Sequence, residues 1–149
     1  MSFRQNSTMN PAIKYIGCDD AELQLFESQY ALPDGMCYNS YVVLGEQKTA
    51  VMDAMDPRCT AQWLAHVSEA LEGRQPDYLV CQHMEPDHSG SMGAFLKKYP
   101  ETTVVCSKQA VTMMAQFGIE AKNTQVVAEG QALDLGGMTL QFIAAPMVH

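Results

Sequence analysis

The chain has 149 residues, and its 17 Asp and Glu outnumber its 9 Lys and Arg, which gives a formal net charge of −8. This acidic balance provides no basic surface for nucleic acid or for an anionic membrane. With 47% hydrophobic and 17% charged residues, the composition is that of a folded domain and excludes wholesale disorder. The longest apolar stretches span a few residues, against the roughly 20 that a membrane helix needs, so we expect no membrane partner.

The N-terminal sequence and the cysteines indicate a reducing compartment. The first residues, MSFRQNSTMNP, are polar and lack the apolar segment of a secretory signal. The five cysteines are odd in number and contain no C-x-x-C pair, which argues against a disulfide framework or a zinc ribbon: Cys18, Cys37, Cys59, Cys81 and Cys106. We therefore expect a cytoplasmic protein.

The first third of the chain predicts strands. Runs rich in β-forming residues cover 13–17, 23–30, 38–44 and 49–53. Turn-forming residues separate them, such as Asp19-Asp20, Pro33-Asp34-Gly35 and Gly45-Glu46. This arrangement predicts a meander or a pair of hairpins.

The rest of the chain alternates helices and strands. From Thr60, the predicted N-cap, Trp63, Val67 and Leu71 lie on one face of a helix that Gly73 ends. The remaining predicted elements are a strand at 78–83, a helix near 90–98, a strand at 102–107, a helix near 108–117, and strands near 124–128, 132–135 and 139–145. The fold class is therefore α/β (α+β), with a mixed sheet packed against helices.

One segment carries four potential metal ligands within six residues: His83, Glu85, Asp87 and His88. If the chain stays extended after the strand, His83 and Glu85 point to the same side. Pro86 keeps Glu85 out of the helical region, and Asp87 and His88 then lie on the turn into the next helix. Two adjacent ligand pairs suggest two metal ions. The alternative is a polar loop in which Asp87 caps the helix.

The ligand types are compatible with iron, manganese or zinc, and the absence of cysteine argues against a structural zinc site. His149, at the end of an apolar run, is a further candidate ligand, or else a terminal histidine that is hydrogen-bonded elsewhere or frayed. Asp53 ends a strand and either forms a turn or holds a metal-bound imidazole in place. Asn39 and Ser40 fit either a turn or the lining of a cleft.

These residues resemble the N-terminal part of a flavodiiron protein (A-type flavoprotein), whose first domain has the metallo-β-lactamase fold. The matching segments are Tyr38–Val43, the strand ending at Asp53, His83–Ser91 and Ala145–His149. Hydrolases of this superfamily typically carry H-x-H-x-D-H. Here Glu85 stands at the second histidine, a replacement typical of the branch that reduces oxygen and nitric oxide.

The resemblance implies a function and a site. His83, Glu85 and His149 would bind one iron, and Asp87 and His88 the other, with Asp53 behind them; it identifies no catalytic residue beyond these. The parent would reduce O2 to water, NO to N2O, or both. Its electrons would pass from rubredoxin or a flavin reductase to FMN in a C-terminal flavodoxin-like domain, within a head-to-tail homodimer.

The same resemblance implies that residues 1–149 are a partial domain. A bridging Asp and a further His of the family's site would lie beyond residue 149, as would the FMN domain, so we expect the chain alone to be inactive. Two alternatives stay open: a zinc-dependent hydrolase of the metallo-β-lactamase superfamily that tolerates Glu85, and a non-catalytic metal-binding half-domain. The apolar run that ends at His149 favours a truncated chain.

Overall fold

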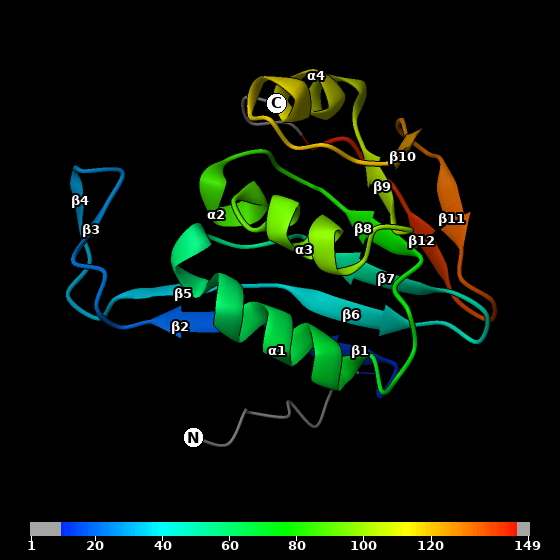
Figure 1. The fold of residues 1–149 in the computed structure, drawn as a ribbon, viewed down its shortest axis with the longest axis horizontal. Helices are drawn as coiled ribbons and strands as arrows, with labels where there is room; N and C mark the ends of the chain where they lie inside the picture. Colours follow the sequence, from blue (N-terminus) through cyan, green and yellow to red (C-terminus); the bar gives the residue numbers. More distant parts are fainter. Residues whose placement is uncertain (1–9, 146–149) are drawn as a thin grey trace.

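A six-stranded mixed sheet forms the centre of the molecule in a computed structural model that describes residues 10–145 (Figure 1). Its strands, in spatial order, are β1 (Ile13–Tyr15), β6 (Tyr41–Leu44), β7 (Thr49–Met52), β8 (Tyr78–Val80), β9 (Thr103–Cys106) and β10 (Asn123–Val126). The β1–β6 and β6–β7 pairs are antiparallel, whereas β7, β8, β9 and β10 pair in parallel. The predicted mixed sheet is confirmed.

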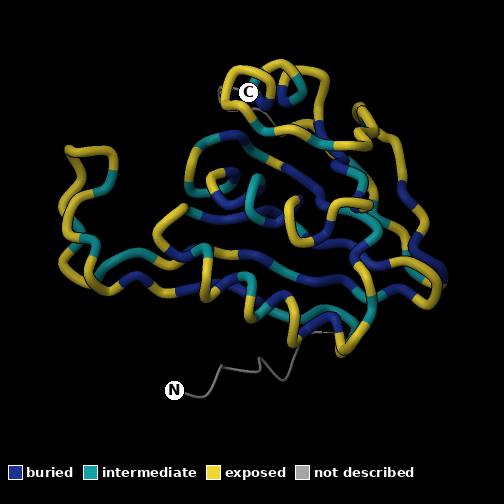
Figure 2. Tube along the Cα trace, in the orientation of Figure 1, coloured by how far each residue is buried: buried dark blue, intermediate teal, exposed yellow. Residues whose placement is uncertain are grey.

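Both faces of the sheet are apolar, because neighbouring residues of each central strand point to opposite sides. Val42, Val51, Leu79 and Val104 belong to the larger core under the helices. Their sequence neighbours face a smaller core on the other side: Val43, Ala50, Val80 and Val105. The buried strands in the middle of Figure 2 reflect this packing on two sides. Runs such as Tyr41–Leu44 are therefore continuously apolar, as strands buried on both faces require.

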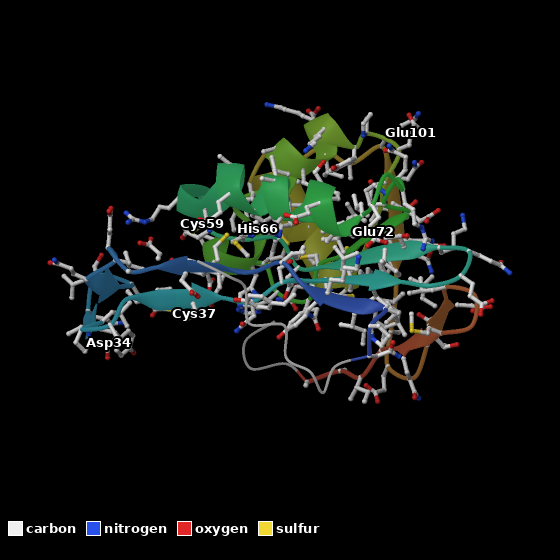
Figure 3. All side chains as sticks on the ribbon, turned by 90° about the horizontal axis from the view of Figure 1, so that it is seen from below. Asp34, Cys37, Cys59, His66, Glu72 and Glu101 are labelled. Atoms are coloured by element: carbon white, nitrogen blue, oxygen red, sulfur yellow. The ribbon has the colours of Figure 1, made fainter. Side chains whose placement is uncertain are left out.

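Helices cover the first face of the sheet. The longer ones are α1 (Thr60–Ala70), α3 (Met92–Lys98) and α4 (Lys108–Gln116), with a 3₁₀ turn η1 (Pro57–Cys59) before α1 and a single turn α2 (Pro86–Ser89) before α3. Trp63 of α1 and Phe95 of α3 are fully buried there, with ring centroids 5.6 Å apart. Figure 3 shows the helices on one side of the sheet and the last hairpin on the other.

That last hairpin, β11 (Ala132–Asp134) with β12 (Thr139–Gln141), covers the second core through Leu133 and Leu135. A second ribbon, β2 (Cys18–Asp20) with β5 (Met36–Tyr38), extends from the sheet and carries a small projecting hairpin, β3 (Leu25–Phe26) with β4 (Tyr30–Ala31). Figures 1 and 2 show this hairpin standing away from the body and largely exposed.

Several predicted boundaries were wrong. The predicted strand 23–30 is a hairpin, because Glu27 and Ser28 adopt positive φ (51° and 60°) and reverse the chain. Thr60 does not cap α1 but is its first residue, since η1 precedes it and Asp56 caps that turn by accepting the N–H of Arg58 at 2.9 Å. The strand predicted to reach residue 83 ends at Val80. Within residues 10–145, no helix has the length and apolarity needed to cross a membrane.

Candidate metal centre

The four clustered ligands lie at the carboxyl end of the parallel strands, where two loops meet. One loop follows β7 and begins at Asp53; the other follows β8 and leads into α2. Backbone hydrogen bonds join them: the Ala54 N–H donates to the His88 carbonyl (N···O 3.0 Å), and the Ser91 N–H donates to the Met55 carbonyl (2.8 Å). This edge of a parallel sheet is the usual place for ligand sites in sheet-and-helix folds.

His83 and Glu85 come together on one side of an extended segment. Met84 between them is fully buried, so its neighbours on both sides turn outward. His83 Nε2 lies 3.3 Å from Glu85 Oε1, and the two side chains are 25% and 42% exposed. Beneath them the Cys81 thiol donates to the His83 carbonyl (S···O 3.2 Å), and burial raises the pKa of Cys81 to about 12, which keeps it a thiol.

Asp87 and His88 form a second pair on α2. His88 Nε2 lies 3.4 Å from Asp87 Oδ2, and the centroids of the His83 and His88 rings are 5.4 Å apart. The alternative of a helix-capping Asp87 is not what the structure shows. Glu85 occupies the N-cap position of α2 without a side-chain capping bond, and Asp87 lies inside the turn.

Asp53 lies behind His88. Its carboxylate is almost completely buried, and Oδ2 lies 3.1 Å from His88 Nδ1. An ionised carboxylate only accepts hydrogen bonds, so Nδ1 is the donor in this contact, and in the neutral ring Nε2 keeps its lone pair. The hydrogen bond with Asp53 is the largest cause that raises the pKa of His88, against desolvation of the ring, which lowers it.

Three residues that support this loop were not identified as site residues from the sequence. Ser40 is fully buried and bridges Trp63 to the backbone around Asp53: its hydroxyl accepts the Trp63 Nε1–H (3.1 Å) and lies 3.0 Å from the Asp53 carbonyl oxygen. Gln82 bonds the Asp53 carboxylate. In the sequence, the Asn39-Ser40 pair gave a weak indication of a place near the site. Trp63 and Gln82 gave none, because their contacts join distant segments.

The donor pairs fit metal binding in part. Each pair holds its two donor atoms 3.3–3.4 Å apart, the spacing of two neighbouring ligands bound to one ion at about 2.0–2.2 Å. Among residues 10–145, however, no three His, Cys, Asp or Glu side chains gather into a ready-made metal cage. The predicted third ligand, His149, lies outside the described residues.

Comparison with known proteins agrees with this reading of the fold. A family model described as "ODP family beta lactamase" matches residues 36–149. Diflavin flavoprotein A 2 of Synechocystis sp. is 38% identical over 135 residues, which are 90% of this chain and 23% of that protein. The coenzyme F420H2 oxidase of Methanocaldococcus jannaschii is 33% identical, over 97% of this chain and 36% of its own length.

The anaerobic nitric oxide reductase flavorubredoxin of Vibrio vulnificus is 32% identical, over 92% of this chain and 28% of its own. The chain thus spans about a quarter to a third of the curated relatives it matches. By name, the last two relatives are oxidoreductases that act on F420H2 and on nitric oxide.

Solved structures show the same fold. The flavodiiron protein of Giardia intestinalis aligns with a TM-score of 0.86 and 27% identity, covering all of this chain and 36% of that one. The rubredoxin:oxygen oxidoreductase of Desulfovibrio gigas also gives 0.86, with 26% identity over 96% of this chain and 36% of its own. The chain therefore belongs to the ODP beta-lactamase family and, within it, to the metallo-β-lactamase-like N-terminal domains of flavodiiron proteins.

Proposed function

We propose that this chain supplies most of the diiron site of an oxidoreductase that reduces O2 to water, NO to N2O, or both. The observation that carries the proposal is the pair of neighbouring His–carboxylate sets, His83 with Glu85 and His88 with Asp87, at the edge of a parallel sheet. The names of the relatives, an F420H2 oxidase, a nitric oxide reductase and an oxygen oxidoreductase, support both substrates.

Each residue has a distinct role in this proposal. His83, Glu85 and, outside the described residues, His149 would hold one iron; Asp87 and His88 would hold the other. Bound iron would supply redox equivalents and Lewis acidity to the substrate. The carboxylates of Glu85 and Asp87 would offset the cationic charge, and Asp53 would keep His88 Nε2 directed at the metal.

The wider context of the site belongs to the same proposal. We assign residues 1–149 to part of the diiron domain, with FMN carried by the parent's flavodoxin-like domain. A head-to-tail homodimer would bring FMN to the iron, with rubredoxin or a flavin reductase as the electron donor; a rubredoxin partner is supported by the names of two relatives. Free cysteines at all five positions fit a cytoplasmic, reducing setting.

The test is anaerobic loading of the chain with Fe2+, removal of excess metal, and measurement of iron per chain. His83→Ala and His88→Ala should each lower the iron retained at a fixed chelator concentration by about tenfold or more, since each removes a ligand. His66→Ala is the matched control, because His66 lies on α1 with Nδ1 3.1 Å from the Gly17 carbonyl oxygen. Equal retention by all variants would refute the proposed site.

Metal identity and turnover separate the proposal from its alternative. Preferred retention of Zn2+ over Fe2+, together with ester or phosphodiester hydrolysis, would refute the oxidoreductase and support a zinc hydrolase. We expect residues 1–149, loaded with iron, to show no sustained flavin-driven O2 consumption in an oxygen electrode, because the proposal places FMN on another domain of the parent. Sustained consumption would contradict the assignment of residues 1–149 to a partial domain.

A further inference from the structure

The Asp53 carboxylate receives more hydrogen bonds than a turn residue needs. The Gln82 backbone N–H donates to Oδ1 (N···O 2.8 Å), and the Gln82 side-chain Nε2 donates to Oδ2 (3.1 Å). His88 Nδ1 lies 3.1 Å from the same Oδ2. One residue therefore holds both carboxylate oxygens, and one of these oxygens is shared with a candidate metal ligand.

The two hydrogen bonds from Gln82 constrain the Asp53 carboxylate in different ways. The backbone N–H holds only Oδ1, and a carboxylate held at one oxygen still turns about its Cβ–Cγ bond. The side-chain amide holds Oδ2 as well, which sets the plane of the carboxylate and the direction in which Oδ2 accepts from His88. That direction sets which ring nitrogen of His88 carries the proton.

Asp53 and Gln82 differ in how far they are buried. Asp53 is 4% exposed and is held in a left-handed backbone conformation (φ 59°), so its position is set by the fold. Gln82 is exposed, and it is not among the apolar residues that form the two cores of residues 10–145. The Gln82 side chain thus orients the buried Asp53 carboxylate from the surface, so that replacing Gln82 should disturb the packing of the core little.

We propose that Gln82 is a positioning residue, whose side-chain amide fixes the Asp53 carboxylate so that His88 presents Nε2 to the metal. This inference rests on the metal role proposed above for His88. It adds a residue outside the H-x-E-x-D-H segment and makes a chain of three side chains, Gln82, Asp53 and His88, each holding the next.

The test compares Gln82→Met, which keeps the length and the backbone N–H but removes the amide, with Gln82→Glu, which places a second carboxylate against Asp53. Gln75→Met is the matched control, because Gln75 is also exposed but lies before β8, at the opposite end of the strand from Gln82. All variants are prepared in the full 149-residue chain.

Two readouts are taken. Ring 15N chemical shifts of His88 in metal-free protein, at a pH where they show a neutral ring, report the tautomer. Competition between the chain and a chromophoric chelator for Co2+ reports metal affinity. We expect Gln82→Met to lower the Nδ1–H population and to weaken Co2+ binding about tenfold. Gln82→Glu should weaken binding further, and Gln75→Met should match the wild type in both readouts.

The outcomes distinguish the two proposals. Wild-type tautomer and wild-type Co2+ affinity in Gln82→Met would overturn the positioning role. A wild-type chain that binds no Co2+ would contradict the proposed metal site, and the 15N shifts would then decide alone whether Gln82 orients His88. Equal thermal midpoints of Gln82→Met and Gln75→Met in chelator exclude unfolding as the cause of any loss. Unequal midpoints, with an unchanged tautomer, would make Gln82 a structural residue and overturn the proposal.

Discussion

Asp53, whose side chain contacts His88, has a left-handed backbone conformation with φ 59°. This conformation costs a non-glycine residue about 1–2 kcal/mol, and such strain persists where surrounding contacts enforce it. Here the enforcing contacts are visible: the Asp53 N–H donates to the Val80 carbonyl (2.8 Å), and the Ser40 hydroxyl lies 3.0 Å from the Asp53 carbonyl oxygen.

Ser40→Ala tests this support at the residue scale. The substitution removes the acceptor of the buried Trp63 Nε1–H, and an unpaired buried donor costs about 1–3 kcal/mol. We expect the free energy of unfolding to fall by that amount in urea titrations followed by the fluorescence of Trp63, the single tryptophan. Ser68→Ala, on the exposed side of α1, should stay within about 0.5 kcal/mol of the wild type. Equal losses in both variants would contradict the bridging role.

Asp20 predicts a pH dependence. Arg58 Nε donates to its carboxylate at 2.6 Å, and this hydrogen bond is the main cause that lowers the pKa of Asp20. A carboxyl whose folded pKa lies below its unfolded value stabilises the protein above the unfolded pKa of about 3.9. That contribution disappears as the pH falls through the folded pKa.

We therefore expect Asp20→Asn to be less stable than the wild type at pH 7, with the difference shrinking as the pH falls below about 4. Urea midpoints measured between pH 7 and pH 2 provide the check. A constant difference across this range would show that the Asp20–Arg58 pair contributes no pH-linked stability.

At the scale of elements, the tight turn of the projecting β3–β4 hairpin consists of residues that are poorly suited to its backbone conformation. The Gln29 N–H donates to the Phe26 carbonyl (3.1 Å), and the two residues between, Glu27 and Ser28, both have positive φ. Tight hairpin turns of this kind favour Asn and Gly because other residues are strained there. The hairpin forms nonetheless, since the ribbon of β2 and β5 below it brings its two ends together.

Ser28→Gly should relieve strain in this turn and stabilise the hairpin by about 0.5–1 kcal/mol. Amide hydrogen exchange of Leu32, whose N–H donates to the Gln24 carbonyl (2.9 Å), would report the gain as slower exchange. Ser68→Gly is the control in which glycine should have the opposite effect on stability, because glycine inside the helix α1 destabilises it by about 0.5–1 kcal/mol. Faster exchange at Leu32 in Ser28→Gly would argue against strain at that position.

For the whole molecule, the last hairpin attaches to the sheet through a close backbone contact at Gly45. A Cβ at this position would lie 2.2 Å from the Leu135 carbonyl oxygen. That oxygen accepts the N–H of Gln47 (3.0 Å) and of Lys48 (2.9 Å), which ties β11 and β12 to the turn between β6 and β7. The second core, under Leu133 and Leu135, depends on this attachment.

Gly45→Ala should force these backbones apart and destabilise the chain by about 1–3 kcal/mol, with faster amide exchange at Gln47 and Lys48. Gly93→Ala is the matched control: in the described part of the chain, no atom outside its own helix and its chain neighbours lies within 4 Å of the added Cβ, and the site is helical. It should be neutral or stabilise by up to about 1 kcal/mol. Thermal unfolding measures the stability of both variants. A Gly45→Ala variant as stable as the wild type would refute the attachment.

Much of the fold could be predicted from local pattern. The helix containing Trp63, the α4 segment and the parallel strands were predicted because apolar periodicity and turn residues act within a few neighbours. The 23–30 segment was misread because its apolar residues look like one strand, whereas the reversal at Glu27 and Ser28 is imposed by the ribbon that carries it.

The sequence by itself determined the acidic mixed α/β fold and the spacing of the candidate ligands. Those depend on composition, on the period of an extended segment and on Pro86. Only the tertiary structure decided what lies behind the ligands, because the pairing of β7 with β8 brings Asp53 to His88 across 35 positions and to Gln82 across 29. Contacts between strand ends leave no local pattern, so the sequence left Asp53 open between a turn and a support for an imidazole. Only the folded chain showed that Asp53 contacts His88 and that Gln82 contacts Asp53.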